Sequence, residues 1–203
     1  MKNLFKILLA VVALAVVGCT TDTTDDLAVD FNKGNGQTTI TLSLDGTRTH
    51  LGAKGEEGYP LYWSKGDQIA LNGVASAPLG EEFDGQSAAT FTFEGELTAP
   101  YNVVYPAPAE GVVASVEGLY PVVFPASQSY NAANPAEVAA PMYGYAPAGE
   151  TMTLQHLSGV LRFLIKGNGE VLESIEVRSE SGKIAGIFDV NCADGTLTAR
   201  EDA

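Results

Sequence analysis

Apolar and polar residues alternate along much of the chain after Gln37, and this two-residue period constrains the fold more than any other feature. Ile40, Leu42 and Leu44 alternate with threonine and serine, as expected of a β-strand (38–44) with one buried face. Further strand-like segments lie at 61–63, 68–71, 90–93, 101–105, 120–124, 152–157, 160–166, 174–178 and 183–190. Turn signals such as Asp45-Gly46 and Asn72-Gly73 separate many of them. Short strands at this spacing predict an all-β fold, an antiparallel β-sandwich.

The composition is compatible with one folded body. The chain has 203 residues, of which 45% are hydrophobic, so a sizeable core can be buried. Residues 127–145 are rich in proline and alanine, and we interpret them as a long loop crossing the sandwich. Trp63 is expected in the core, with the turn at Gly66-Asp67 following it.

The N-terminus has the pattern of a lipoprotein signal peptide over residues 1–18. Lys2 and Lys6 precede an unbroken apolar run at 7–17, which is too short to span a bilayer but suits a signal peptide. The run ends at Gly18-Cys19, which looks like a lipobox, so we expect cleavage between Gly18 and Cys19 and acylation of Cys19. The alternative is an ordinary secretory signal that happens to end in cysteine.

The acidic balance limits the partners. Acidic residues outnumber basic ones by 25 to 11, which gives a net charge of -14 and argues against nucleic acid. Residues 19–36 are polar and read as a flexible tether. Asp22, Asp25 and Asp26 resemble the acidic stretch that directs some lipoproteins across the outer membrane to the cell surface. A solvated spacer without an address is the alternative.

The sequence offers little catalytic chemistry. His50 and His156 lack metal-ligand spacing, and His156 between apolar residues is better explained as a hydrogen-bonded structural histidine. Cys192 is the only cysteine besides Cys19, and we expect it to be buried and inert. We therefore predict no enzyme, no catalytic residues, no cofactor and no metal. An alternative role in glycan binding rests on a group of tyrosines that could stack on sugars: Tyr101, Tyr105, Tyr120, Tyr130, Tyr143 and Tyr145.

Several motifs, taken in order, resemble the fimbrillin family, the lipoprotein pilins of Bacteroides-type (type V) fimbriae. They are YWSKGDQI at 62–69, TFTFEG at 90–95, YNVVYP at 101–106, FPASQ at 124–128, PM at 141–142 and LQHLSGVLRF at 154–163. The resemblance covers about residues 37–190, which would correspond to the N-terminal β-sandwich domain of the family, of transthyretin-like or immunoglobulin-like architecture.

The resemblance implies a mode of assembly. Fimbrillins are exported as lipidated precursors, and a surface protease cuts after an arginine in the loop that follows the first strand. The vacated groove is filled by a strand from the next subunit, so that a filament grows. In this sequence the matching arginine is Arg48, with cleavage before Thr49. The alternative is a loop arginine that is never cut, as in an anchor subunit.

The same resemblance implies the partners and the location. The expected partners are other fimbrial subunits, the outer membrane through the lipid on Cys19, and an adhesion target on a host or bacterial surface. The expected location is the outer membrane, at the cell surface and in the fimbrium. Family members carry a second domain with a donor strand, and residues 191–203 would be the start of a missing or truncated C-terminal region.

Overall fold

The fold is all-β and its sheets are antiparallel, which confirms the predicted class. The computed structural model describes residues 31–34, 36–44, 62–129, 141–148, 152–159, 161, 163 and 165–201. The strands in these residues are β1 (Phe31–Gly34), β2 (Gln37–Ser43), β3 (Ala70–Leu71), β4 (Val74–Ala75), β5 (Ala88–Glu94), β6 (Tyr101–Tyr105), β7 (Tyr120–Phe124), β8 (Met142–Ala146), β9 (Gln155–His156), β10 (Gly186–Asn191) and β11 (Thr196–Ala199). A single turn of 3₁₀ helix, η1 (Glu81–Phe83), precedes β5.

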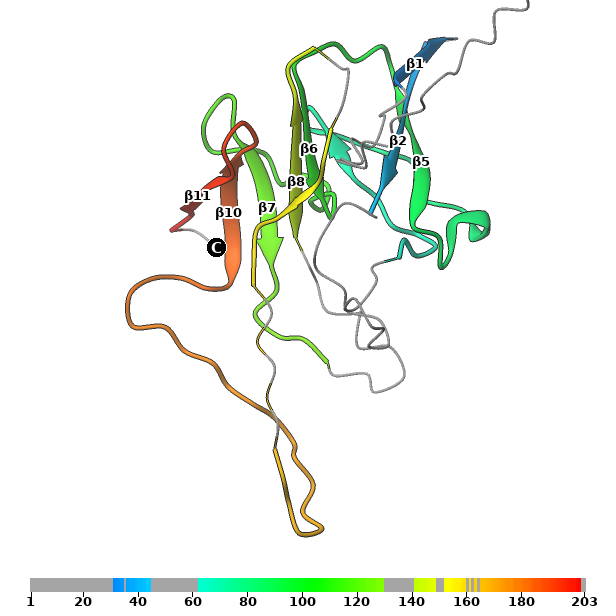
Figure 1. Cartoon of the computed structure of the whole chain (residues 1–203). Helices are drawn as coiled ribbons and strands as arrows, with labels where there is room; N and C mark the ends of the chain where they lie inside the picture. The colour runs from blue at the N-terminus through cyan, green and yellow to red at the C-terminus, as the bar shows by residue number, and fades with distance from the viewer. Residues whose placement is uncertain are drawn as a thin grey trace, which may run out of the picture.

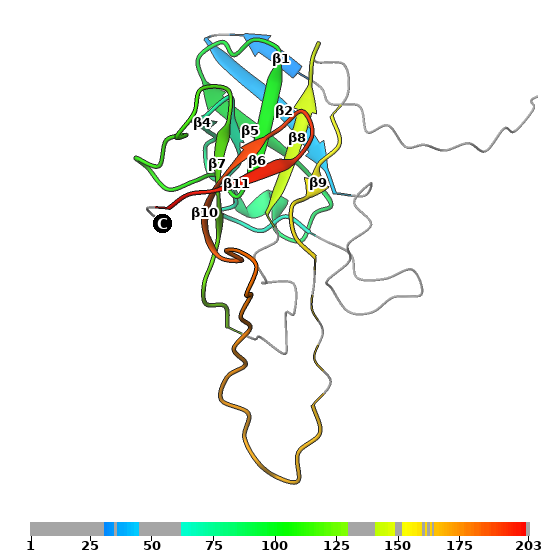
Figure 2. The ribbon, with the colours of Figure 1, turned by 90° about the vertical axis from the view of Figure 1, so that its left-hand side faces the viewer.

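Three sheets lie in layers (Figures 1 and 2). The strand orders are β1-β2-β5, β4-β3-β6-β8-β9 and β11-β10-β7, and every pair is antiparallel. The five-stranded sheet occupies the middle, with β2 and β5 on one side of it and β7 and β10 on the other. The arrangement therefore extends the expected two-sheet sandwich by a third layer.

The side chains of the middle sheet explain how it can have sheets on both sides. On β6, Tyr101 and Val103 belong to the apolar cluster shared with β2 and β5, while Val104 belongs to the cluster shared with β7 and β10. On β8, Met142 and Tyr143 divide in the same way. Successive side chains of a strand point to opposite faces. The middle strands are therefore apolar on both faces, and each face seals one of the two cores.

Close packing in the larger core depends on a glycine. A Cβ added to Gly144 on β8 would lie 2.8 Å from Met152 Sδ and 3.0 Å from a methyl carbon of Leu154. Both side chains are buried, so any larger residue at this position would displace them.

The outer sheet is pinned by a buried ion pair. Asp189 on β10 is fully buried, and its Oδ1 accepts a hydrogen bond from Arg200 Nε at 3.1 Å. Its Oδ2 accepts one from the backbone N of Ser115 at 3.2 Å. Burial raises the pKa of Asp189, but the hydrogen bonds from Arg200 and Ser115 outweigh it, so the pKa lies below its usual value. The ionised carboxylate thus holds the end of β11 and the 112–115 loop together.

Several expected elements agree with the structure. Strands β6 and β7 have the predicted bounds, and β2 and β5 overlap the segments predicted at 38–44 and 90–93. Trp63 is buried, and the backbone N of Asp67 donates to Ser64 O at 3.0 Å to close the predicted turn.

Other expectations were wrong. Residues 142–145, assigned to the crossing loop at 127–145, belong to β8. The strand was missed because a strand that is buried on both faces shows no alternation. Residues 31–34, assigned to the tether, form β1 in a hairpin with β2. Residues 196–199 form β11 and pair with β10, so they belong to the folded body.

The largest discrepancy concerns the strands expected at 160–166 and 174–178. Among the described residues between 161 and 184, none is in a strand and every one is exposed. We call residues 161–184 the arm; it extends away from the three sheets (Figures 1 and 2). Alternation of apolar and polar residues shows that a segment is able to pair in a sheet, but a partner strand must also be present. No strand among the described residues pairs with the arm.

Candidate functional site

The candidate site is the groove that holds β2. Seven residue pairs join β2 to β5, from Gln37 opposite Glu94 to Ser43 opposite Ala88. On its other side β2 pairs with β1, and β1 pairs with no other strand among the described residues. The β1–β2 hairpin therefore joins the rest of the body through a single ladder.

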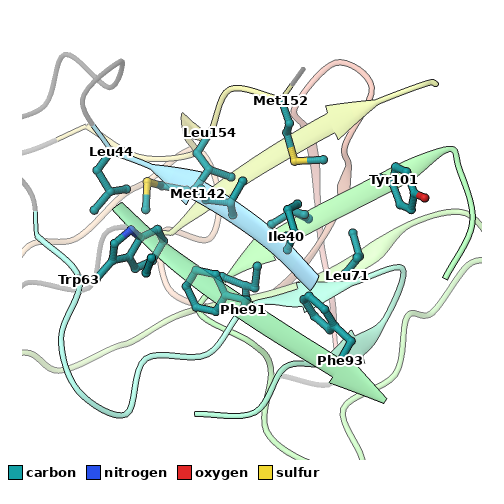
Figure 3. Packing of buried hydrophobic residues seen from close by; sticks show 14 of the residues in the cluster. Ile40, Leu44, Trp63, Leu71, Phe91, Phe93, Tyr101, Met142, Met152 and Leu154 are labelled. Carbon is teal, nitrogen blue, oxygen red and sulfur yellow. The ribbon is translucent and has the colours of Figure 1, made fainter. Parts of the chain in front are cut away.

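One face of β2 is buried in the larger core. Ile40 and Leu42 are 0% and 1% exposed, and Leu44 just after the strand is 4% exposed. Figure 3 shows Ile40 and Leu44 among core side chains that include Phe91 and Met142. These alternate apolar side chains occupy successive apolar sites of the groove, which we call its sockets.

Polar contacts fix the position of β2 along the groove. Thr38 Oγ1 donates to Gly95 O at 2.9 Å and accepts from the backbone N of Leu97 at 2.9 Å. At the other end, the backbone N of Leu44 donates to Ser87 O at 2.8 Å. Thr38 is itself fully buried, so both of its bonds form away from water. Hydrogen bonds at both ends and apolar contacts along one face therefore fix the register of a strand in this groove.

Strand β5 is the last strand of its sheet, and on its far edge Thr92 O accepts a hydrogen bond from the backbone N of Ala77 at 2.8 Å. If β2 left, the edge of β5 that β2 now covers would become open, next to the emptied sockets. Such an edge is a template for an added strand.

The predicted modification residues all lie outside the described residues. These are Gly18, Cys19, Arg48 and Thr49. Their order along the chain is nevertheless informative, since β1 and β2 both precede Arg48, and Trp63 and the rest of the body follow it. A cut after Arg48 would separate the whole β1–β2 hairpin covalently from the groove.

Two of the six tyrosines lie side by side at a hollow. Tyr143 and Tyr145 occupy alternate positions of β8, and together with Thr153, Gln155 and Cys192 they line a hollow of about 280 Å³. Tyr143 Oη donates to Gln155 Oε1 at 2.9 Å, and Tyr145 is 36% exposed. Burial, with a contribution from nearby Asp194, raises the pKa of Tyr143, so its hydroxyl keeps its proton.

The other tyrosines do not join this hollow. Tyr101 is buried in the larger core, and Tyr105 makes an edge contact with Trp63 at a centroid distance of 5.4 Å. Tyr105 Oη also donates to Asp67 Oδ1 at 3.1 Å, and burial raises the pKa of both groups. Tyr120 packs against the smaller core, and Tyr130 lies outside the described residues. Sequence reasoning therefore grouped residues that the fold separates.

Two further titratable residues considered from the sequence, Cys192 and His156, have pKa values shifted by burial. Cys192 is 1% exposed, as predicted, and burial raises its pKa to about 12. Burial also lowers the pKa of His156, whose buried Nε2 has no hydrogen-bond partner among the described residues. No group of three or more metal-binding side chains gathers in the described part of the chain. No helix in that part is long and apolar enough to cross a membrane.

No family model matches the chain, and no curated protein and no solved structure matches it at a significant level.

Proposed function

We propose that this chain is a cell-surface lipoprotein that acts as a fimbrial subunit or adhesin component and is assembled by protease-triggered β-strand exchange. Its lipid would be carried on Cys19 at the outer membrane, and the cut would fall between Arg48 and Thr49. The finer fold would be the transthyretin-like or immunoglobulin-like sandwich of the fimbrillins. The observation that carries the proposal is the place of the β1–β2 hairpin, which precedes Arg48 and fills a groove of the body that follows it.

The energetics of the groove support exchange over simple loss of the strand. Burying Ile40, Leu42 and Leu44 contributes roughly 5–9 kcal/mol at about 1.5–3 kcal/mol for each side chain. This is comparable to the whole stability of a typical domain, about 5–15 kcal/mol. A cut subunit therefore needs a replacement strand with apolar residues at alternate positions. Head-to-tail donation of such a strand between subunits builds an open filament.

The N-terminal sequence of surface-assembled protein tests this proposal. The expected sequence begins at Thr49, and Arg48→Ala should abolish both the cut and the assembly. Arg178→Ala is the matched control, because Arg178 is an exposed arginine that follows Arg48 by 130 residues in the sequence, and it should leave processing unchanged. Assembled material that still carries an acylated Cys19 would contradict the proposal and favour an uncut anchor subunit.

A second candidate function, glycan binding without polymerisation, is favoured by the hollow at Tyr143 and Tyr145. The volume of this hollow lies near the lower limit for ligand sites. The ring of Tyr145, which is 36% exposed, could stack on one sugar ring, and the amide of Gln155 lines the same hollow. Affinity gels with polysaccharides test this function. Tight binding that Tyr145→Ala removes and Tyr62→Ala keeps would favour it; Tyr62 is an exposed tyrosine elsewhere. We propose no enzymatic activity.

A further inference from the structure

Most of the exposed large hydrophobic side chains among the described residues lie in the arm. Eight large hydrophobic side chains of the arm have exposed fractions between 44% and 85%: Leu161, Phe163, Ile165, Val171, Leu172, Ile175, Val177 and Ile184. Only three large hydrophobic residues elsewhere in the described chain, Tyr62, Val113 and Val116, are exposed to a similar degree. Apolar surface concentrated in this way marks an interaction site.

The arm contains two segments whose sequence has a strand-like pattern. Leg 1 (residues 161–166) and leg 2 (residues 170–178) flank the Gly167-Asn168-Gly169 turn signal. In leg 2 the guanidinium of Arg178 donates to both carboxylate oxygens of Glu176, at 2.9 and 3.0 Å. Residues two apart in an extended chain share a face. Val171, Ile175 and Val177 therefore share the opposite face, which is mainly apolar and also carries Glu173.

The charges of the arm differ from those of the rest of the chain. Residues 161–184 contain four basic and four acidic residues, so the net charge of -14 lies entirely outside the arm. Leg 1 carries Arg162 and Lys166, a charge of +2. Leg 2 carries three glutamates and one arginine, a charge of -2. Two copies that repel each other elsewhere can thus approach through their arms, with leg 1 of each facing leg 2 of the other.

We propose that the arm is a self-association element, in which leg 1 of one copy pairs with leg 2 of a second copy and the reverse. This contact is reciprocal and closes as a two-fold dimer. Pairing of the two legs within one copy would give an isolated two-stranded hairpin, which is marginal in water. Two arms bring four extended segments together and cover both apolar faces.

This inference does not depend on the proposed strand exchange. It uses residues that follow Arg48 and requires no cut, and it forms a closed dimer where strand exchange forms an open filament. An uncut chain that dimerises but never polymerises would leave the arm inference standing. A chain that polymerises after the cut but stays monomeric when uncut would leave strand exchange standing.

Charge reversal of each leg tests the inference in the full, uncut chain. Arg162→Glu with Lys166→Glu changes leg 1 from +2 to -2, and Glu173→Lys with Glu176→Lys changes leg 2 from -2 to +2. The chains are purified in density-matched detergent and their mass is measured by sedimentation equilibrium. The parent chain should dimerise, and each variant alone should self-associate about tenfold more weakly or worse, because like charges then face each other.

Mixing the two variants separates association between copies from pairing within one copy. In the mixture, every reversed leg meets an oppositely charged leg of the other variant, so a heterodimer of parent-like affinity is expected. Pairing within one copy cannot be rescued by mixing. A parent chain that stays monomeric, or a mixture that shows no heterodimer, would overturn the inference.

A second pair of variants tests the apolar face. Phe163→Ser should weaken the dimer, whereas Val116→Ser, at an exposed apolar position outside the arm, should leave it unchanged. Equal effects of the two substitutions would show that general hydrophobicity, and not the arm, causes the association.

Discussion

Strand β2 and leg 1 of the arm have similar sequence patterns, but the apolar side chains are buried in β2 and exposed in leg 1. In β2, Ile40 and Leu42 are almost fully buried beside β5, whereas in leg 1 Leu161 and Phe163 are more than half exposed. Since both segments have apolar residues at alternate positions, the difference lies in what each segment has for a partner. Alternation encodes the capacity to pair, and tertiary context decides whether pairing occurs.

The comparison predicts the largest difference for two phenylalanines. Phe91→Ala should lower the free energy of unfolding by about 4 kcal/mol, because it opens a cavity in the larger core. Phe163→Ala should change it by less than about 0.5 kcal/mol in the monomer, since the side chain is 51% exposed and belongs to neither apolar cluster. Urea unfolding at low protein concentration measures both. Equal losses would mean that the arm folds onto the body.

Two arginines extend the comparison to ion pairs. Arg200→Met should cost about 3 kcal/mol of stability, since it leaves the buried carboxylate of Asp189 without its cationic partner. Arg178→Met should cost less than about 1 kcal/mol, because its pair with Glu176 is exposed. Thermal unfolding of the two variants checks the difference. A similar melting temperature for both would show that the Asp189 pair contributes little.

Two threonines on opposite faces of β2 sharpen the account of the groove. Thr38→Val should cost about 1–3 kcal/mol, because Gly95 O and the backbone N of Leu97 lose their buried partner. Thr41→Val should cost less than about 0.5 kcal/mol, since its hydroxyl contacts Thr90 Oγ1 at the surface. Chemical denaturation provides the measurement. A larger cost at Thr41 would reverse the assignment of the two faces.

The buried ion pair of Asp189 predicts an acid-dependent contribution of the body to the stability. The pKa of Asp189 is lower in the folded chain than its ordinary value of 3.8. Its stabilising contribution is therefore complete above about pH 4 and is lost as the pH falls through the lowered pKa. Unfolding measured between pH 6 and about pH 2 should show this loss. In Arg200→Met the acid-dependent part should become smaller, and an unchanged profile would contradict the assignment.

Most of β2 and β5 was predicted because polar residues alternate with apolar ones along them. The bounds of β6 and β7 were predicted from short runs of valine and aromatic residues. Strand β8 was not, since Met142, Tyr143 and Ala146 are buried on its two faces and no polar residue marks a pattern. The short strands β1 and β11 give no hydrophobic signal of their own and are defined by their partners.

The candidate site was predictable in part. The first long strand and the arginine after it could be read from the sequence and from its resemblance to fimbrillins. The sockets that hold Ile40 and Leu42 could not, because Phe91 and Met142 come from segments about 50 and 100 residues away in the sequence. The grouping of Tyr143, Tyr145 and Gln155 likewise depends on the pairing of β8 with β9.

The central claim is that β2 can be exchanged for another strand once the chain is cut after Arg48. The most direct measurement is the incorporation of a fluorescent peptide of residues 36–44 into the cut chain, followed by anisotropy and by the melting temperature. The account predicts that the peptide binds and restores thermal stability, and that a peptide with Ile40→Asp and Leu42→Asp does not. A cut chain that remains fully stable and takes up neither peptide would contradict it.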